Sequence, residues 1–148
     1  MSRFFPDYDP LKFNDTLPPY ADRPFPGVCW MKPQGSTQAF YARLRFTLNE
    51  KTTIRFHVSG DRWFDLRLDG QFITDGPECS DSAHWCYSSF EEELMPGEHE
   101  FFARIVMLPA KLKPWNAMGG NCGFFFFAEA PFTELLSTGA GAWEFAIA

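Results

Sequence analysis

The stretch AFYARLRFTL, residues 39–48, indicates the fold class of this chain. Every second position holds an apolar side chain, namely Phe40, Ala42, Leu44, Phe46 and Leu48. The positions between them hold Tyr41, Arg43, Arg45 and Thr47. A period of two residues is typical of a strand that packs one face on a core and turns the other to solvent. The stretch is therefore predicted to be a half-buried β-strand.

Similar alternation, or short apolar runs, returns along the chain between turn residues. Further strands are predicted around residues 54–58, 64–68, 71–74, 87–94, 100–108, 124–127 and 143–147. Asp69-Gly70 is a strong hairpin signal, because a type I′ turn needs positive φ at both central positions. Only residues 132–136 favour a helical turn. Seven or eight short strands predict an all-β fold, an antiparallel β-sandwich of the jelly-roll type.

Length and composition agree with one β domain. The chain has 148 residues, of which 18% are aromatic, with 12 Pro and 11 Gly. Aromatic residues favour strands, and Pro and Gly favour turns. Residues 1–36 are rich in proline and lack periodicity, which predicts an irregular arm packed on the core by aromatic side chains such as Phe4, Phe5 and Trp30. Residues 37–148 are predicted to form the sandwich.

The net charge and the first residues of the chain indicate which partners and which cellular location to expect. The net charge of −6 argues against a nucleic-acid backbone as the ligand, and no apolar run has membrane-spanning length. The first residues lack the apolar core of a secretory signal, so a cytoplasmic location is expected. Accordingly, the four cysteines are expected to be reduced and packed. They are Cys29, Cys79, Cys86 and Cys122.

No catalytic residue is assigned from the sequence. The chain contains no GxSxG elbow, HExxH helix or glycine-rich phosphate loop. The run Glu91-Glu92-Glu93 lies on a predicted strand, where alternate residues point to opposite faces, and it is interpreted as a solvated edge. A small hydrolase complete in itself is therefore the least favoured interpretation.

Two loops hold the residues that suit carbohydrate binding. Sugars are recognised by an aromatic face that stacks on the ring and by polar groups that bond the hydroxyls. The candidates in residues 75–85 are His84 and Trp85, and those in residues 109–123 are Trp115, Asn116 and Asn121. Asp75, Glu78 and Asp81 are candidate ligands of a calcium ion, the one cofactor that the loop suggests. The alternative is that both tryptophans cover the ends of a Phe-rich core and the acids only solvate the loop.

The order of several segments resembles a known family. Residues 58–70 read VSGDRWFDLRLDG, residues 75–77 read DGP, residues 84–87 read HWCY, and residues 94–99 read LMPGEH, followed by STG at residues 137–139. This order resembles the galactose-binding-like β-sandwich that precedes the catalytic domain of bacterial α-L-rhamnosidases. The resemblance covers residues 39–148. Asp69 and His99 depart from it, since the family usually has Asn at both positions.

The resemblance implies a non-catalytic accessory domain of a rhamnosidase-like glycoside hydrolase. Its partners would be the catalytic domain of the same protein and a plant or bacterial glycan, with L-rhamnose as the candidate sugar. The catalytic acids of such enzymes belong to a separate helical barrel, which this chain does not contain. The alternative function is a free-standing carbohydrate- or partner-binding β-sandwich. A docking surface left open in the isolated domain would include exposed apolar side chains, with Trp30 and Trp143 as candidates.

Overall fold

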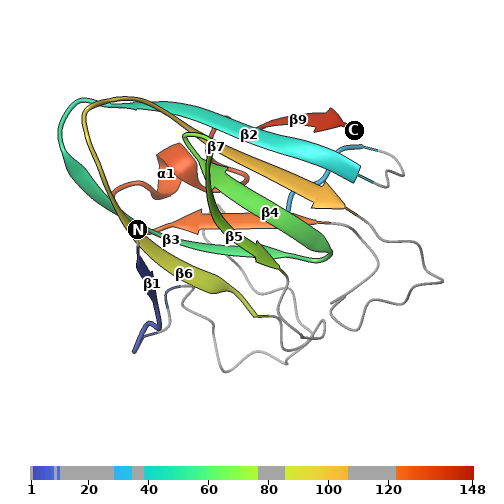
Figure 1. Ribbon diagram of the computed structural model, residues 1–148, viewed down its shortest axis with the longest axis horizontal. Coiled ribbons are helices and arrows are strands. Elements are labelled where there is room, and N and C mark those ends of the chain that lie inside the picture. Colours follow the sequence, from blue (N-terminus) through green and yellow to red (C-terminus); the bar gives the residue numbers. More distant parts are fainter. Residues whose placement is uncertain (1, 9, 11–28, 35–38, 77–85, 107–122) are drawn as a thin grey trace.

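The computed structural model of the chain describes residues 2–8, 10, 29–34, 39–76, 86–106 and 123–148. These residues form nine strands and one short helix (Figure 1). The elements are β1 (Ser2–Phe4), β2 (Ala39–Leu48), β3 (Thr52–Gly60), β4 (Trp63–Leu68), β5 (Gln71–Gly76), β6 (Ser88–Leu94), β7 (Gly97–Val106), β8 (Phe124–Ala128), α1 (Thr133–Leu136) and β9 (Glu144–Ile147). None of the helical structure in these ranges is long and apolar enough to cross a membrane.

The strands form two antiparallel sheets that pack face to face (Figure 1). One sheet has the order β1-β6-β3-β8, and the other has the order β5-β4-β7-β2-β9. Among the described strands, only β4 and β5 are both consecutive in the chain and adjacent in a sheet. Every other pair of consecutive strands is divided between the two sheets, and β1 pairs with β6, which is distant in the sequence. The prediction of an all-β antiparallel sandwich is confirmed.

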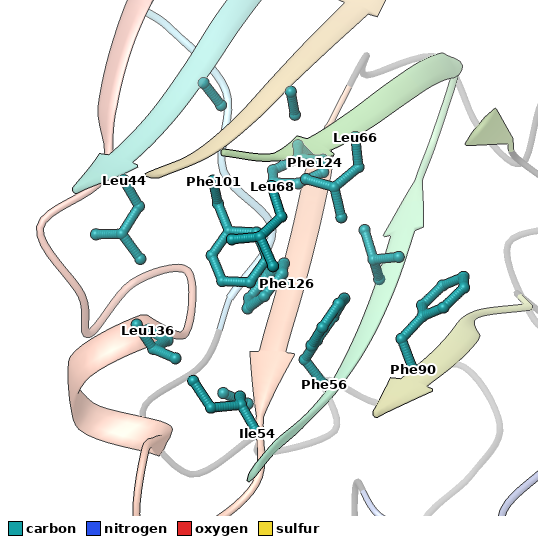
Figure 2. Packing of buried hydrophobic residues seen from close by; sticks show 14 of the residues in the cluster. Leu44, Ile54, Phe56, Leu66, Leu68, Phe90, Phe101, Phe124, Phe126 and Leu136 are labelled. Carbon is teal, nitrogen blue, oxygen red and sulfur yellow. The ribbon is translucent and has the colours of Figure 1, made fainter. Parts of the chain in front are cut away.

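The core between the sheets is built mainly of phenylalanine. Phe56 of β3 and Phe126 of β8 stack with ring centroids 5.0 Å apart, and Phe101 of β7 packs on both rings at 5.2 and 4.7 Å (Figure 2). All three side chains are completely buried. The alternation predicted for residues 39–48 places Phe40 and Leu44 in the same cluster. Aromatic contacts across the two sheets therefore hold the sandwich together.

The Asp69-Gly70 turn joins β4 to β5 as predicted. Both residues have positive φ, 51° and 79°, as a type I′ turn requires. Oδ1 of Asp69 accepts a 2.8 Å hydrogen bond from the Glu100 backbone N–H. Oδ2 lies 2.7 Å from Nδ1 of His99, and Nε2 of His99 lies 2.8 Å from the Met95 carbonyl oxygen. The two residues that depart from the family pattern thus contact each other and tie the turn to β7.

The described residues of the N-terminal segment pack on the outer face of the four-stranded sheet. The strand β1 pairs with β6, a regular element inside the arm that was expected to be irregular. Trp30 packs on Phe125, with ring centroids 5.4 Å apart, and Phe125 is completely buried although it points away from the main core cluster. Phe5, in contrast, is 87% exposed, so it does not help to hold the arm.

Two hydroxyl groups, together with a backbone bridge between Met31 and Phe124, close the edge of β8 that faces away from β3. The Phe126 backbone N–H donates to Oγ1 of Thr138 at 3.1 Å, and the Ala128 N–H donates to Oγ of Ser137 at 3.1 Å. Oγ1 of Thr138 also donates to the Cys29 carbonyl oxygen at 2.7 Å. Unpaired strand edges invite association with other chains. The STG segment therefore gives β8 partners for its backbone without a further strand.

Candidate functional site

The structure describes one of the eight site residues predicted from the sequence. Asp75 is exposed on β5, opposite Asp65 of β4. It lines a hollow of about 10 Å³ together with Ser59 and Cys86, which is room for about one water molecule. The other seven candidates lie in residues 77–85 and 107–122, outside the described residues. They are Glu78, Asp81, His84, Trp85, Trp115, Asn116 and Asn121.

The described residues contain no group of three or more His, Cys, Asp or Glu side chains that could hold a metal ion. Two members of the predicted calcium set, Glu78 and Asp81, are outside this part of the chain, so calcium binding stays a prediction. Cys29 and Cys86 are free thiols, and both are exposed rather than packed as expected.

A chain of polar side chains runs through the covered face of the four-stranded sheet. His57 of β3 is completely buried, and its Nδ1 lies 2.8 Å from Oγ of Ser89 on the paired strand β6. Its Nε2 lies 2.9 Å from Oε1 of Glu129, which follows β8 and also accepts a hydrogen bond from the hydroxyl of Tyr8. The rings of Phe4, Tyr87 and Phe127 surround the imidazole.

This set has the residue types of a serine hydrolase but not its arrangement. In a catalytic triad the serine faces Nε2 of the histidine and the acid faces Nδ1, whereas here the two partners are exchanged. Ser89 is 3% exposed and sits within a strand paired on both sides, so its hydroxyl is not open to a substrate. The network holds the N-terminal segment and β8 on the sheet, and it is a structural element.

Burial decides the protonation of His57. Desolvation lowers the pKa of the imidazole below its usual value of 6.5, and the hydrogen bond to Glu129 offsets this only in part. The neutral ring can bond both neighbours, because it donates from one nitrogen and accepts at the other. The folded protein therefore favours neutral His57.

The strand β9 lies beside β2 at one edge of the five-stranded sheet (Figure 1). The described residues form a groove on the outer face of this edge. The groove has a volume of about 510 Å³ and is lined by Tyr41, Arg43, Phe102, Glu144, Phe145 and Ala146. Tyr41 of β2 and Phe102 of β7 stack on each other, with ring centroids 5.6 Å apart and an angle of 25° between the rings. Both are half-buried, so each ring keeps part of its surface exposed in the groove.

An ion pair forms the polar part of this groove. Arg43 of β2 and Glu144 of β9 are opposite each other in the sheet. Nε and Nη2 of Arg43 donate to Oε2 of Glu144 at 3.1 and 2.5 Å. The hydrogen bond from Arg43 lowers the pKa of Glu144, so the carboxylate is ionised at neutral pH. Among the described residues Oε1 of Glu144 has no hydrogen-bond partner, which leaves an acceptor for a ligand.

The same face continues beyond the groove towards β4. The guanidinium carbon of Arg104 lies 5.0 Å from the centre of the Trp63 ring, and Nε of Arg104 donates to Oδ2 of Asp65 at 3.1 Å. Arg45 of β2, two residues beyond Arg43, pairs with Glu100 of β7 at 2.9 Å. Aromatic rings beside paired charges therefore occupy much of the face.

The sequence analysis missed this groove for a definable reason. The alternation of residues 39–48 does place Tyr41 and Arg43 on the outward face of their strand. Their partners Phe102 and Glu144 lie on strands far along the chain, and only the register of the sheet brings them alongside. A prediction of which strands pair with one another would have been needed to bring these four residues together.

Comparisons with known proteins give one likeness at the level of fold. No family model and no curated protein matches the chain. Among solved structures, the chain is similar to a GH78 family rhamnosidase of Bacillus sp. GL1, with a TM-score of 0.65 and 18% sequence identity. The match covers 85% of this chain but 14% of the rhamnosidase chain. This chain thus shares its fold with a small part of a much longer hydrolase.

Proposed function

We propose that this chain is a non-catalytic accessory β-sandwich of a rhamnosidase-like glycoside hydrolase, which docks on the catalytic domain and contacts the sugar. The observation that carries the proposal is the fold likeness, which spans 85% of this chain and 14% of a GH78 rhamnosidase chain. The order of sequence segments described above points to the same family independently. The galactose-binding-like assignment belongs to this proposal as well.

The chemistry of the described residues supports a binding role. Their one Ser-His-Glu set, which includes Ser89 and His57, is buried with its hydrogen bonds used inside the fold. The open face of the five-stranded sheet instead offers aromatic rings beside an ion pair, which suits recognition of a ligand or of a neighbouring domain. A free-standing carbohydrate- or partner-binding module is the alternative function.

The test uses the chain alone and with a rhamnosidase catalytic domain from the same organism. We expect that the chain alone releases no p-nitrophenol from p-nitrophenyl α-L-rhamnopyranoside. We also expect that it sediments as a 1:1 complex with the catalytic domain in analytical ultracentrifugation. Saturable hydrolysis by the chain alone would overturn the non-catalytic role. Independent sedimentation of the two proteins would overturn docking and favour the free-standing module.

A further inference from the structure

The groove between β2, β7 and β9 has the chemistry of a sugar subsite. Four of its six lining residues are aromatic or apolar, and the other two are the paired Arg43 and Glu144. The stacked Tyr41 and Phe102 rings lie beside the methyl group of Ala146 and next to the charged pair, whereas the Phe145 side chain packs on the core side of β9. An aromatic platform with a few oriented polar groups is the common design of small-molecule sites.

The charges select a neutral ligand. Arg43 and Glu144 offset each other within the groove, so neither an acidic nor a basic ligand meets an unpaired charge there. Two adjacent sugar hydroxyls can donate to the carboxylate and accept from the guanidinium, whose planar fork suits such paired bonds. The pair is held in place by the sheet register, because Arg43 and Glu144 are directly opposite on β2 and β9. A ligand therefore meets a donor and an acceptor that already lie side by side.

The small residue on β9 creates the space. Ala146 lies directly opposite Tyr41 in the sheet, and its methyl group leaves the side of the Tyr41 ring uncovered. A larger side chain at this edge position would fill the groove. The groove is apolar on both sides of Tyr41, with the Phe102 ring on one side and the Ala146 methyl group on the other. A sugar that carries a methyl group in place of a hydroxymethyl group would bury that methyl without losing a hydrogen bond.

We propose that this groove binds the pyranose ring of a neutral 6-deoxyhexose, with its C–H face on Tyr41 and Phe102 and two hydroxyls on Arg43 and Glu144. The class of glycan in this inference rests on the proposed function. The place of binding and the preference for a 6-deoxy sugar rest on the residues that line the groove. It locates sugar contact on the face of the five-stranded sheet rather than in the two loops that hold Trp85 and Trp115.

The test is isothermal titration calorimetry of the full chain with methyl α-L-rhamnopyranoside. Methyl α-L-mannopyranoside, which differs by a hydroxyl group at C6, is the matched ligand. We expect a dissociation constant on the order of 1 mM for the rhamnoside and weaker binding of the mannoside. The variants Phe102→Ala and Ala146→Phe should each weaken rhamnoside binding by about tenfold or more, one by removing a ring and the other by filling the groove.

Matched controls separate the groove from the rest of the molecule. Arg43→Ala should weaken binding, whereas Arg45→Ala, which removes an arginine on the same face of the same strand but outside the groove, should leave it unchanged. Trp85→Ala and Trp115→Ala should also leave it unchanged. A urea unfolding curve for each variant shows whether the fold is intact. Ala146→Phe keeps the test decisive if Phe102→Ala does not fold, because an exposed edge position tolerates the larger side chain.

Two results would overturn the inference in different ways. Rhamnoside binding that survives in Phe102→Ala and Ala146→Phe but disappears in a tryptophan variant places the sugar in the loops, and the proposed function stands. No binding of either glycoside by the unaltered chain removes the groove as a sugar subsite. If Ala146→Phe then also abolishes the complex with the catalytic domain, the groove belongs to that interface. If the complex never forms, the proposed function fails independently.

Discussion

The outer faces of the two sheets are built from similar side chains but are used differently. His57 of β3 and Phe102 of β7 both lie on interior strands, and both point away from the core between the sheets. His57 is completely buried beneath Phe4, Tyr87 and Phe127, whereas Phe102 is half-exposed in an open groove. Within the described part of the chain, the N-terminal residues cover the first face, and the groove on the second face is not filled.

The difference shows how polar side chains are accommodated on a buried sheet face and on an exposed one. On the covered face, each nitrogen of His57 has a close partner, because a buried polar group without a hydrogen bond is costly. On the outer face of the five-stranded sheet, Arg43 and Arg45 form ion pairs that stay accessible to water, whereas the partner of Arg104, Asp65, is buried. Exposed pairs contribute little to stability, since water screens them. The covered face is therefore expected to contribute more to stability than the face with the exposed ion pairs.

The largest effect is expected from His57→Ala. The change removes a fully buried ring and leaves Ser89 and Glu129 without their partner. Cavity formation and the lost hydrogen bonds together should lower the free energy of unfolding by about 3 kcal/mol. Urea unfolding followed by tryptophan fluorescence measures the change. A loss below about 1 kcal/mol would mean that the covered face contributes no more than an exposed surface does.

A smaller effect is expected from Phe102→Ala on the open face. The ring is half-buried and its main aromatic contact is Tyr41, so its removal should cost about 1 kcal/mol. The same urea experiment gives a direct comparison with His57→Ala, since both residues occupy outward positions on interior strands. Equal losses for the two variants would contradict the contrast between a covered and an open face.

The smallest effect is expected in the pH dependence of stability. Burial holds the pKa of His57 below 6.5, so the unfolded chain binds a proton at a pH where the folded protein does not. Stability from this residue is therefore present above pH 6.5 and is lost as the pH falls through that value. The measurement is the urea midpoint at several pH values, and His57→Gln should reduce the acid-side loss.

His99 provides the control of opposite sign. Burial lowers its pKa, but the hydrogen bonds to Asp69 and to the Met95 carbonyl outweigh burial and raise the pKa above 6.5. Its contribution is fully present below pH 6.5 and is lost as the pH rises through the raised pKa. His99→Gln should therefore leave the acid-side loss intact. An equal change of the acid-side slope in both variants would contradict the assignment of that slope to His57.

Local patterns accounted for the elements of this fold. Alternation predicted the strand at residues 39–48 with the observed bounds, and Asp69-Gly70 forms the predicted hairpin turn. Residues 132–136 hold the single short helix of the described chain. Each of these predictions depends on neighbours within a few residues, for which side-chain period and allowed φ values are decisive. The strand at Ser2–Phe4 was missed, because its pairing with β6 rather than its own sequence makes it a strand.

The sequence by itself determined the sandwich, because periodic burial and turn chemistry are properties of short segments. It also placed Tyr41 and Arg43 on an outward face. Only the tertiary structure decided which outward residues meet. Pairing of β2 with β7 and β9 brings Phe102 and Glu144 to the groove, and pairing of β3 with β6 and β8 encloses His57. Contacts between distant segments depend on strand order and register, and those follow from the packing of the whole chain.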